Sequence, residues 1–421
     1  MGRPKKPFLT TIFFALINYT NMAYAGLFST SNTTISLRNA YIDRDYKQRN
    51  APLSRVGGWT QGADVQFKSG YTQGPIRFGL DVSAQYAIRL DGGGGRGPDT
   101  IIPYSETKTR QATDYGHVAS TLKAKISETE FKVGEFRPVL PVAHFDDSRQ
   151  LITSFQGWQI ESREILPLTL TLGKYSSVVG RNSSDRENIS LSGADTAQTS
   201  DGLLFAGGKY SFTPWISGTY FYGRLEDIYQ QHYAGLALNN NLGHGYTLKT
   251  DFRYFDSREN GKALNGTIDN QVYGVMTSLK KSGHSLGLGY QRMLGYSAFP
   301  LLNGYAASPY LVNWSPTGFS KAHETSWQLR YDYDFVTLGV PGLKFMSRFI
   351  RGSNIDSINA NQKGSEWEAT TSIGYVIQSG DFKDLAFEWR HIDQRANYSM
   401  SKVAPQHYDE NRLITTYTFR F

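Results

Sequence analysis

The sequence predicts an all-β protein whose strands close into a transmembrane antiparallel β-barrel. Three observations predict this fold class: long segments of strict alternation between apolar and polar residues, a polar face that is ionic in segment after segment, and frequent Tyr (27) and Gly (42). Mean hydropathy is low (−0.43). After residue 25 no apolar run is long enough for a membrane helix, so strands would have to cross any membrane.

The first 25 residues are typical of a secretory signal peptide. A basic start (Arg3, Lys5 and Lys6) precedes an apolar run over 8–19, and Ala23-Tyr24-Ala25 has the small-residue pattern of a cleavage site. We therefore expect a mature chain from Gly26, forming one barrel domain over residues 26–421.

The alternation is clearest in IRFGLDVSAQYAIRL, where eight apolar residues of 76–90 occupy every second position. SWQLRYDYDF (326–335) and LAFEWRH (385–391) repeat the pattern, with aromatic residues near the ends of the apolar face. One such strand would also fit a soluble sandwich. Its recurrence with an ionic opposite face favours a barrel with an outward apolar band and a wet interior.

About 396 residues would accommodate 16 to 18 crossings of about 9–11 residues each. Short turns are predicted at 340–342 and 379–381, and long polar surface loops at 91–114, 179–199 and 353–364. Residues 412–421 are predicted to form the final strand, which would pair with the first, with Phe421 in the periplasmic aromatic belt.

Charge and composition exclude several classes. Removing three basic residues with the signal takes the net charge from +7 to +4, which is too little for a nucleic-acid binder. There is no cysteine, and the eight His residues form no metal-ligating pair, so neither a metal site nor a cofactor is predicted. Gly283-His284-Ser285-Leu286-Gly287 matches a hydrolase nucleophile motif. It continues as an alternating strand rather than entering a helix, so an enzyme is not expected.

Several stretches in order along the chain resemble the OprD family of outer-membrane porins. They include LRNAYIDRD (37–45), WTQGADVQFKSGYTQGPIRFGLDV (59–82), LKAKISETEFKVGEFRPVLPV (122–142), SRQLITSFQGWQIESREI (148–165) and GVPGLKFMSRFI (339–350). The resemblance implies an 18-stranded, weakly trimeric barrel in the outer membrane of a Gram-negative bacterium. It also implies an inward-folded third loop at about 136–157, a ladder of basic side chains along the pore, and small carboxylate-bearing solutes. The stretch 283–314 is more similar to the branch that takes aromatic and other organic acids than to the branch for basic amino acids.

Alternation places seven basic side chains on the lumen face, where guanidinium groups would keep a carboxylate solvated along its path. These candidates are Arg38, Lys123, Lys125, Arg330, Arg348, Arg390 and Arg412. The alternative is an ion-paired lumen face without selectivity, because acidic residues share the same strands. From the resemblance, Arg149 is expected to face the constriction. Asp146 and Asp147 would either oppose the ladder or bond backbone N–H groups within their loop.

These features predict a passive channel for small organic anions such as benzoate-like acids. A channel for basic amino acids or peptides, or a general diffusion porin, is the alternative, and a barrel enzyme is less favoured. The expected partners are outer-membrane lipid, lipopolysaccharide, the barrel-assembly machinery through the strand ending in Phe421, and two further copies in a weak homotrimer.

Overall fold

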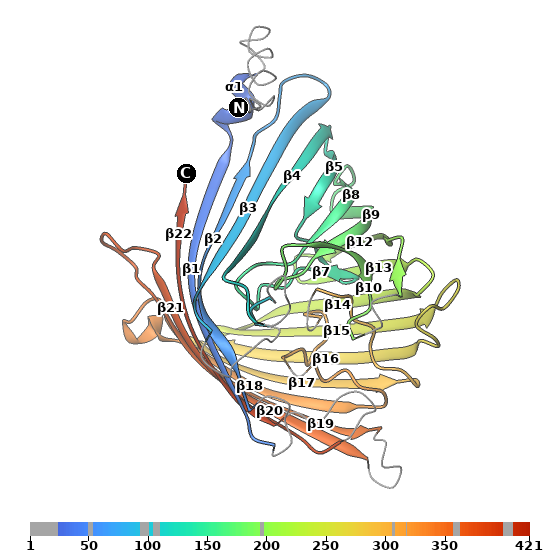
Figure 1. Ribbon diagram of the computed structural model, residues 1–421, viewed down its shortest axis with the longest axis vertical. Coiled ribbons are helices and arrows are strands. Elements are labelled where there is room, and N and C mark those ends of the chain that lie inside the picture. Colours follow the sequence, from blue (N-terminus) through green and yellow to red (C-terminus); the bar gives the residue numbers. More distant parts are fainter. Residues whose placement is uncertain are drawn as a thin grey trace, which may run out of the picture.

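A computed structural model describes residues 24–48, 54–92, 101–103, 110–193, 198–304, 308–316, 318–356, 363–398 and 407–421 (Figure 1). The main sheet has 20 strands. Two of them, β10 (Arg186–Ser190) and β11 (Thr199–Ser200), are short strands that pair with each other in the loop between β9 and β12, which leaves 20 − 2 = 18 barrel strands. The first nine are β1 (Asn32–Tyr46), β2 (Arg55–Lys68), β3 (Arg77–Asp91), β4 (Asp114–Ile126), β5 (Thr129–Phe136), β8 (Ser154–Ser162), β9 (Leu168–Val179), β12 (Leu203–Thr213) and β13 (Ile216–Leu225). The other nine are β14 (Tyr229–Gly243), β15 (Tyr246–Glu259), β16 (Asp269–Lys281), β17 (His284–Leu294), β18 (Thr325–Asp334), β19 (Leu343–Ile355), β20 (Gly364–Val376), β21 (Ala386–Ala396) and β22 (Tyr408–Arg420).

The barrel closes because the last strand pairs with the first. β22 runs antiparallel to β1 over thirteen residue pairs, from Thr34 opposite Arg420 to Tyr46 opposite Tyr408. The Thr33 amide also donates to the Phe421 carbonyl at 3.0 Å. The predicted pairing of the terminal strands, and the 18-stranded antiparallel barrel, are therefore confirmed. Closure leaves no open edge in the lipid, where an unpaired backbone group would find no partner.

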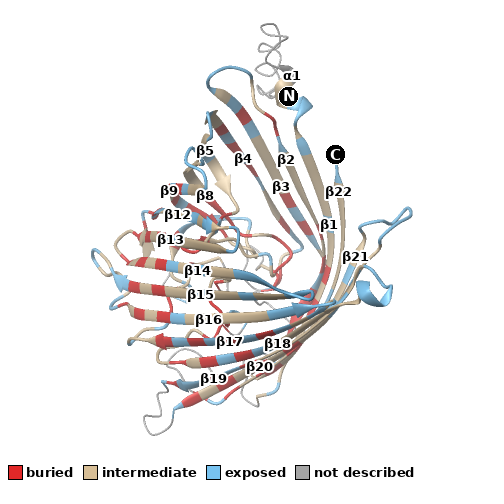
Figure 2. Ribbon diagram, turned by 180° about the vertical axis from the view of Figure 1, so that it is seen from behind, coloured by how far each residue is buried: buried red, intermediate tan, exposed pale blue. Residues whose placement is uncertain are grey.

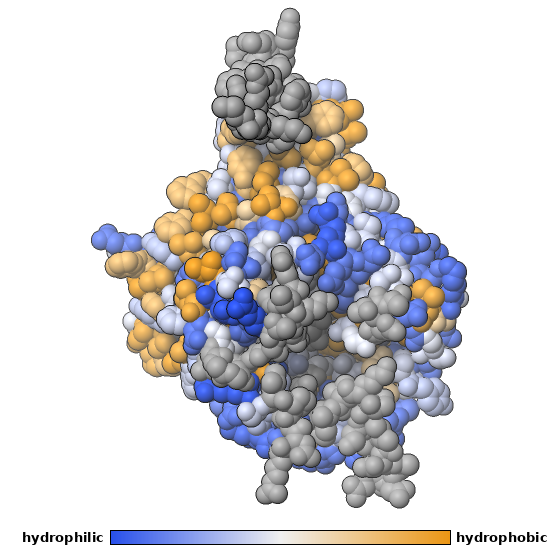
Figure 3. All heavy atoms as spheres, in the orientation of Figure 1, coloured by the Kyte–Doolittle hydropathy of each residue, from blue (hydrophilic) through white to orange (hydrophobic). Residues whose placement is uncertain are grey.

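Period-two burial shows which face of each strand meets lipid. In β17, His284, Leu286, Leu288, Tyr290 and Arg292 are exposed, and the residues between them are buried or half-buried. Figure 2 shows this alternation along β17 and part of β18. In Figure 3 hydrophobic side chains gather over the upper and left part of the face, where Figure 1 draws β22, β1 and β2. No described helix is long and apolar enough to cross a membrane.

Short turns join the strands at the end that carries both termini, as at Ser282-Gly283 and His244-Gly245. Short turns mark the periplasmic end of such barrels. The predicted turn at 340–342 lies at this end, after the 3-10 helix η1 (Phe335–Leu338), and the turn at 379–381 lies between β20 and β21. The helix α1 (Tyr24–Ser29) precedes β1, whereas residues 1–23 of the expected signal peptide lie outside the described residues.

Described parts of two long loops at the opposite, extracellular end enter the barrel mouth more deeply than surface loops would. Ile102 and Ile189 are fully buried, although they belong to the segments 91–114 and 179–199 that the sequence predicts as polar surface loops. That prediction is wrong for these two positions, because their apolar side chains fill the interior instead of meeting water. A larger apolar cluster lines the inner wall from β8 to β17 and includes Phe155, Tyr175 and Phe255.

Candidate solute channel

The loop between β5 and β8, residues 137–153, folds into the barrel and is the constriction loop below. It contains a small hairpin, β6 (Val139–Leu140) and β7 (Ala143–His144), next to Pro138 and Pro141. The sequence places this loop at about 136–157, but residues 154–157 belong to β8. Val142 and Ala143 join the apolar cluster of the β8–β17 wall, so one side of the loop packs on that wall.

The other side of the constriction loop is hydrogen-bonded to the wall formed by β1, β2 and β3. The Arg38 guanidinium donates to the carbonyls of Asp147 (3.0 Å) and Arg149 (2.7 Å). In return, the Gln150 amide donates to the Arg38 carbonyl at 3.0 Å. Farther along, the Ile152 backbone and the Gln85 side-chain amide exchange two hydrogen bonds of 2.8 and 3.1 Å. These contacts fix the loop across the barrel, so the path for solutes runs beside it.

The two aspartates of the loop have different surroundings. The Asp146 carboxylate accepts from the Ser148 amide at 2.7 Å and pairs with Arg181 at 2.8 Å, and Arg181 also contacts the Ser148 hydroxyl. Asp147 is exposed beside the channel. The geometry therefore ties Asp146 to its own loop, whereas the exposed Asp147 carboxylate lies where it can act on a passing charge.

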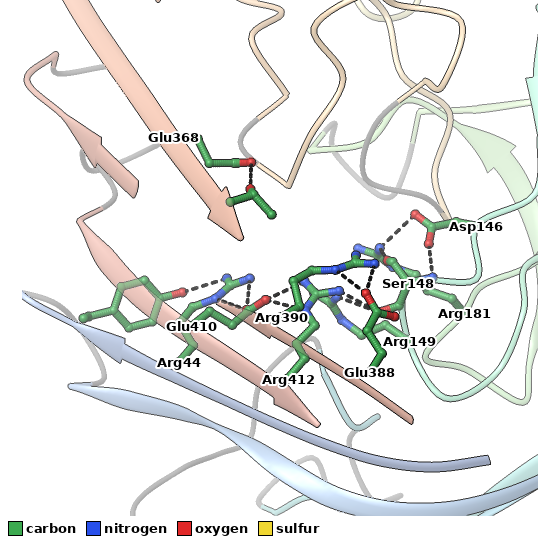
Figure 4. Close-up of polar contacts among 12 residues, drawn as sticks. Arg44, Asp146, Ser148, Arg149, Arg181, Glu368, Glu388, Arg390, Glu410 and Arg412 are labelled. Atoms are coloured by element: carbon green, nitrogen blue, oxygen red, sulfur yellow. Dashed lines mark hydrogen bonds and ion pairs between the residues drawn. The ribbon is translucent and has the colours of Figure 1, made fainter. Parts of the chain in front are cut away.

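Arg149 does not line the opening. Its side chain is 5% exposed and lies behind the loop, near Arg412 and Arg181 (Figure 4). Burial lowers the pKa of Arg149 well below its ordinary value, and the neighbouring cations Arg181, Arg412 and Arg44 act in the same direction. The expectation that Arg149 faces the constriction is wrong, because its side chain is buried and donates to the Ser148 carbonyl at 3.1 Å, while Arg38 donates to its own carbonyl.

Four predicted arginines form a row across the late strands, with two directly opposed cross-strand pairs. Arg330 on β18 faces Arg348 on β19, and Arg390 on β21 faces Arg412 on β22. Like charges in such positions repel. Each has a carboxylate partner on the same face: Asp332 for Arg330 (2.7 Å), Glu368 for Arg348 (3.2 Å), Glu388 for Arg390 (2.6 Å) and Glu410 for Arg412 (2.5 Å). Figure 4 shows the Glu388 and Glu410 pairs beside the constriction loop.

Solvent exposure divides this row into two kinds of site. The side chains of Arg330 and Arg390 are 39% and 36% exposed, and those of their partners Asp332 and Glu388 are 33% and 31% exposed. Arg348 and Arg412 are 10% and 3% exposed, and their glutamates are fully buried. The first two can meet a solute in the channel. Arg348 and Arg412 instead fix the backbone of inward loops. Arg348 donates to the Trp314 carbonyl at 3.1 Å, and Arg412 donates to the Ser148 carbonyl at 3.4 Å.

The two lysines predicted for the ladder lie elsewhere. Lys123, on β4, is buried against Asp81 (2.6 Å) and the Ser69 carbonyl (2.7 Å). Lys125 lies near the periplasmic turn and pairs with Glu128 at 2.9 Å. β2 and β3 separate β4 from Arg38 on β1, so these lysines do not extend the arginine row.

Sequence reasoning missed a second inward loop between β17 and β18, which the structure describes over 295–304, 308–316 and 318–324. Arg253 on β15 donates to the carbonyls of Pro309 (3.0 Å) and Leu311 (3.2 Å), and Leu302 and Leu311 are buried in the interior cluster. Tyr310 donates to the Val139 carbonyl at 2.9 Å, which joins this loop to the constriction loop. A signal was present in LLNGYAASPYLVNW (301–314), an apolar and aromatic run without strand periodicity.

Two open cavities lie along the resulting path. One, of about 300 Å³, lies between the constriction loop and the β21–β3 wall and is lined by Arg38, Asp64, Asp147 and Glu388 among others. The other, of about 350 Å³, lies beside β2 to β8 and is lined by Lys132, Arg137 and Glu135 among others.

A closed 18-stranded barrel with an apolar outer band, an ionic lumen and an inward constriction loop has the architecture of an outer-membrane porin. The family model described as outer membrane porin, OprD family, matches residues 25–421. The chain belongs to the OprD family, and it is a channel protein of the Gram-negative outer membrane rather than an enzyme.

Individual relatives agree with this assignment. The porin-like protein GalP of Pseudomonas putida is 36% identical over 394 residues, which cover 93% of this chain and 92% of the relative. The crystal structure of Pseudomonas aeruginosa OccK9 (OpdG) is 38% identical with a TM-score of 0.88, covering 94% of this chain and 100% of that one. The structure of Pseudomonas aeruginosa OpdK with vanillate is 34% identical with a TM-score of 0.87 and the same coverage.

Proposed function

We propose that this porin passes small organic carboxylates, aromatic acids among them, by passive diffusion past the exposed arginines of its lumen. The observation that carries the proposal is the pair Arg330 and Arg390, whose guanidinium groups are the accessible members of the row. A guanidinium offers paired donors to a carboxylate. Each arginine also has a carboxylate neighbour on its own strand, which keeps the attraction moderate and allows a solute to leave.

The relatives support the class of solute. OpdK, one third identical to this chain, was solved with vanillate, which is an aromatic carboxylate. In this chain Tyr310 and His144 pack edge to face at 6.1 Å beside the constriction loop. Aromatic rings at that place favour an aromatic solute whose carboxylate is held on the opposite, arginine-bearing wall.

The lining of the smaller cavity favours a second candidate, a channel for basic amino acids or a general diffusion pore. That cavity has three carboxylates, Asp64, Asp147 and Glu388, against one arginine, Arg38. Asp64 is already paired with Arg137 at 2.5 Å, which weakens the case for a cationic solute.

Single-channel currents in planar bilayers separate these functions. Purified protein would be titrated with benzoate and, in parallel, with arginine. We expect benzoate to block or permeate, and the Arg390→Gln variant to weaken that interaction about tenfold or more. A response to arginine alone would move the protein to the basic amino acid function, and a large conductance indifferent to both would mean a general pore.

The proposal extends to export and assembly. Residues 1–25 would direct export and be removed, and the barrel-assembly machinery would recognise the strand β22 with the exposed ring of Phe421. The barrel would sit among phospholipid and lipopolysaccharide as a weak homotrimer. Deleting Phe421 should lower the amount of folded protein in the outer membrane, as measured by heat-modifiable migration of membrane fractions, without abolishing synthesis.

A further inference from the structure

The outer surface carries a row of alternating tryptophans and arginines that the channel function does not use. Trp327 on β18, Arg351 on β19, Trp367 on β20 and Arg395 on β21 are successive cross-strand partners. The neighbours of these residues along each strand include Gln328, Ile350, Glu366 and Gln394, all of which are buried inside the barrel. The four residues of the row therefore face outward.

The row lies at the extracellular edge of the apolar band. Trp327 is 46% exposed, and Leu329, two residues nearer the periplasmic end, begins the exposed apolar stretch of the same strand. Toward the extracellular end, β18 begins at Thr325, only two residues before Trp327. Tryptophan rings prefer the boundary between hydrocarbon and headgroups. The arginines at the same level therefore lie at headgroup depth in the outer leaflet.

Among the described residues, two arginines of this surface have no carboxylate partner. Arg351, and Arg292 on the neighbouring strand β17, are exposed and form no ion pair with any carboxylate in the part of the chain that the structure describes. Arg395 is different, because it pairs with Asp409 at 3.0 Å and with Asp393, while its guanidinium lies 5.8 Å from the Trp367 ring centroid. The surface thus presents unsatisfied positive charge between aromatic rings.

We propose that this surface, named the Arg–Trp row (Arg292, Trp327, Arg351, Trp367 and Arg395), binds the phosphates of a phosphorylated glycolipid of the outer leaflet, lipopolysaccharide. Guanidinium groups match phosphate oxygens with paired donors. The exposed apolar band directly below would meet the acyl chains of the same molecule. A free phosphate ion would contact only the arginines and leave the apolar band unused. A second copy of this chain would place its own arginines against these arginines, and the like charges would repel each other.

The test is retention of lipid A by the full-length barrel. Wild type and the double variant Arg292→Gln/Arg351→Gln would be incubated with diphosphorylated lipid A in detergent, and the bound lipid counted by native mass spectrometry. Cations near an anionic lipid surface contribute about 1 kcal/mol each, so losing two should weaken binding about twentyfold or more. The matched control is Lys281→Gln, an exposed cation 3.9 Å from the Tyr246 ring but at the periplasmic end. It should leave lipid A binding unchanged.

Two further measurements distinguish the outcomes. The single-channel conductance of the double variant should equal that of wild type, since both arginines lie outside the lumen, and this shows that the barrel is folded whether or not the solute proposal holds. Equal lipid A binding by the double variant would overturn the inference. So would equally tight binding of dephosphorylated lipid A or of inorganic phosphate, or a change of oligomeric state in lipid-free detergent that accounts for the lost binding.

Discussion

Arg330 and Arg348 are opposed on adjacent strands, yet removing their charges should have different consequences. The side chains of Arg330 and Asp332 are 39% and 33% exposed, so Arg330→Gln should lower the free energy of unfolding by no more than about 1 kcal/mol. Arg348 is nearly buried, and its partner Glu368 is fully buried. Arg348→Gln would remove the Arg348 cation from beside this buried carboxylate and should cost about 3–5 kcal/mol. Its bond to the Trp314 carbonyl would also be weakened or lost.

Guanidinium-induced unfolding in lipid vesicles, followed by tryptophan fluorescence, measures both effects in the same assay. The Arg348→Gln midpoint should fall well below the wild-type value, and the Arg330→Gln midpoint should stay near it. Channel recordings should show the converse order, with a larger loss of benzoate affinity in Arg330→Gln. A double change to Arg348→Met/Glu368→Leu should recover much of the lost stability, because it removes both buried charges. Equal destabilisation by the two single variants would refute the division of the row into exposed arginines and buried, loop-binding arginines.

Other predictions concern the constriction loop. Asp146→Ala breaks its contacts with the Ser148 amide and Arg181 and should raise single-channel noise, whereas the matched change Asp147→Asn should shift ion preference toward anions with little added noise. Burial lowers the pKa of His144, so this histidine stays neutral in the loop while the unfolded chain takes up a proton at its ordinary pKa. The stability that neutral His144 contributes to the loop should therefore be lost as the pH falls from the ordinary pKa of histidine toward the lowered pKa of His144. This loss should appear as pH-dependent single-channel noise, and the His144→Phe variant should abolish it. Gly62→Val should displace Gln150, because an added Cβ would overlap its side-chain amide nitrogen, and should change the single-channel conductance while the barrel stays folded.

The barrel could be predicted from sequence because its signal is periodic. Each strand repeats apolar and polar residues with period two, and Leu329, Tyr331 and Gln328 fall on the faces that alternation assigns them. Closure followed from the same logic, since an unpaired terminal strand would be costly in lipid. The inward direction of Arg330, Arg348, Arg390 and Arg412 was predictable for the same reason.

Which of those arginines meet solvent could not be predicted. Arg348 and Arg412 are buried by loop backbone, at Trp314 and Ser148, and loop paths have no periodic signal in the sequence. The same reason explains the error at Arg149 and the missed second inward loop. Where the constriction loop leaves β5 and enters β8, the Ser154 hydroxyl donates to the Glu135 carboxylate at 2.5 Å, and this carboxylate also contacts His117 on β4. No local sequence motif indicates this cluster.

The central claim is that exposed lumen arginines give this porin a preference for organic carboxylates. The most direct test is the reversal potential of a single channel under a gradient of sodium benzoate, for wild type, Arg330→Gln/Arg390→Gln and the outward-facing control Lys281→Gln. The account predicts a wild-type and control potential close to the equilibrium potential of benzoate, and a shift toward that of sodium in the double variant. A wild-type channel that prefers sodium, or a double variant with an unchanged potential, would contradict it.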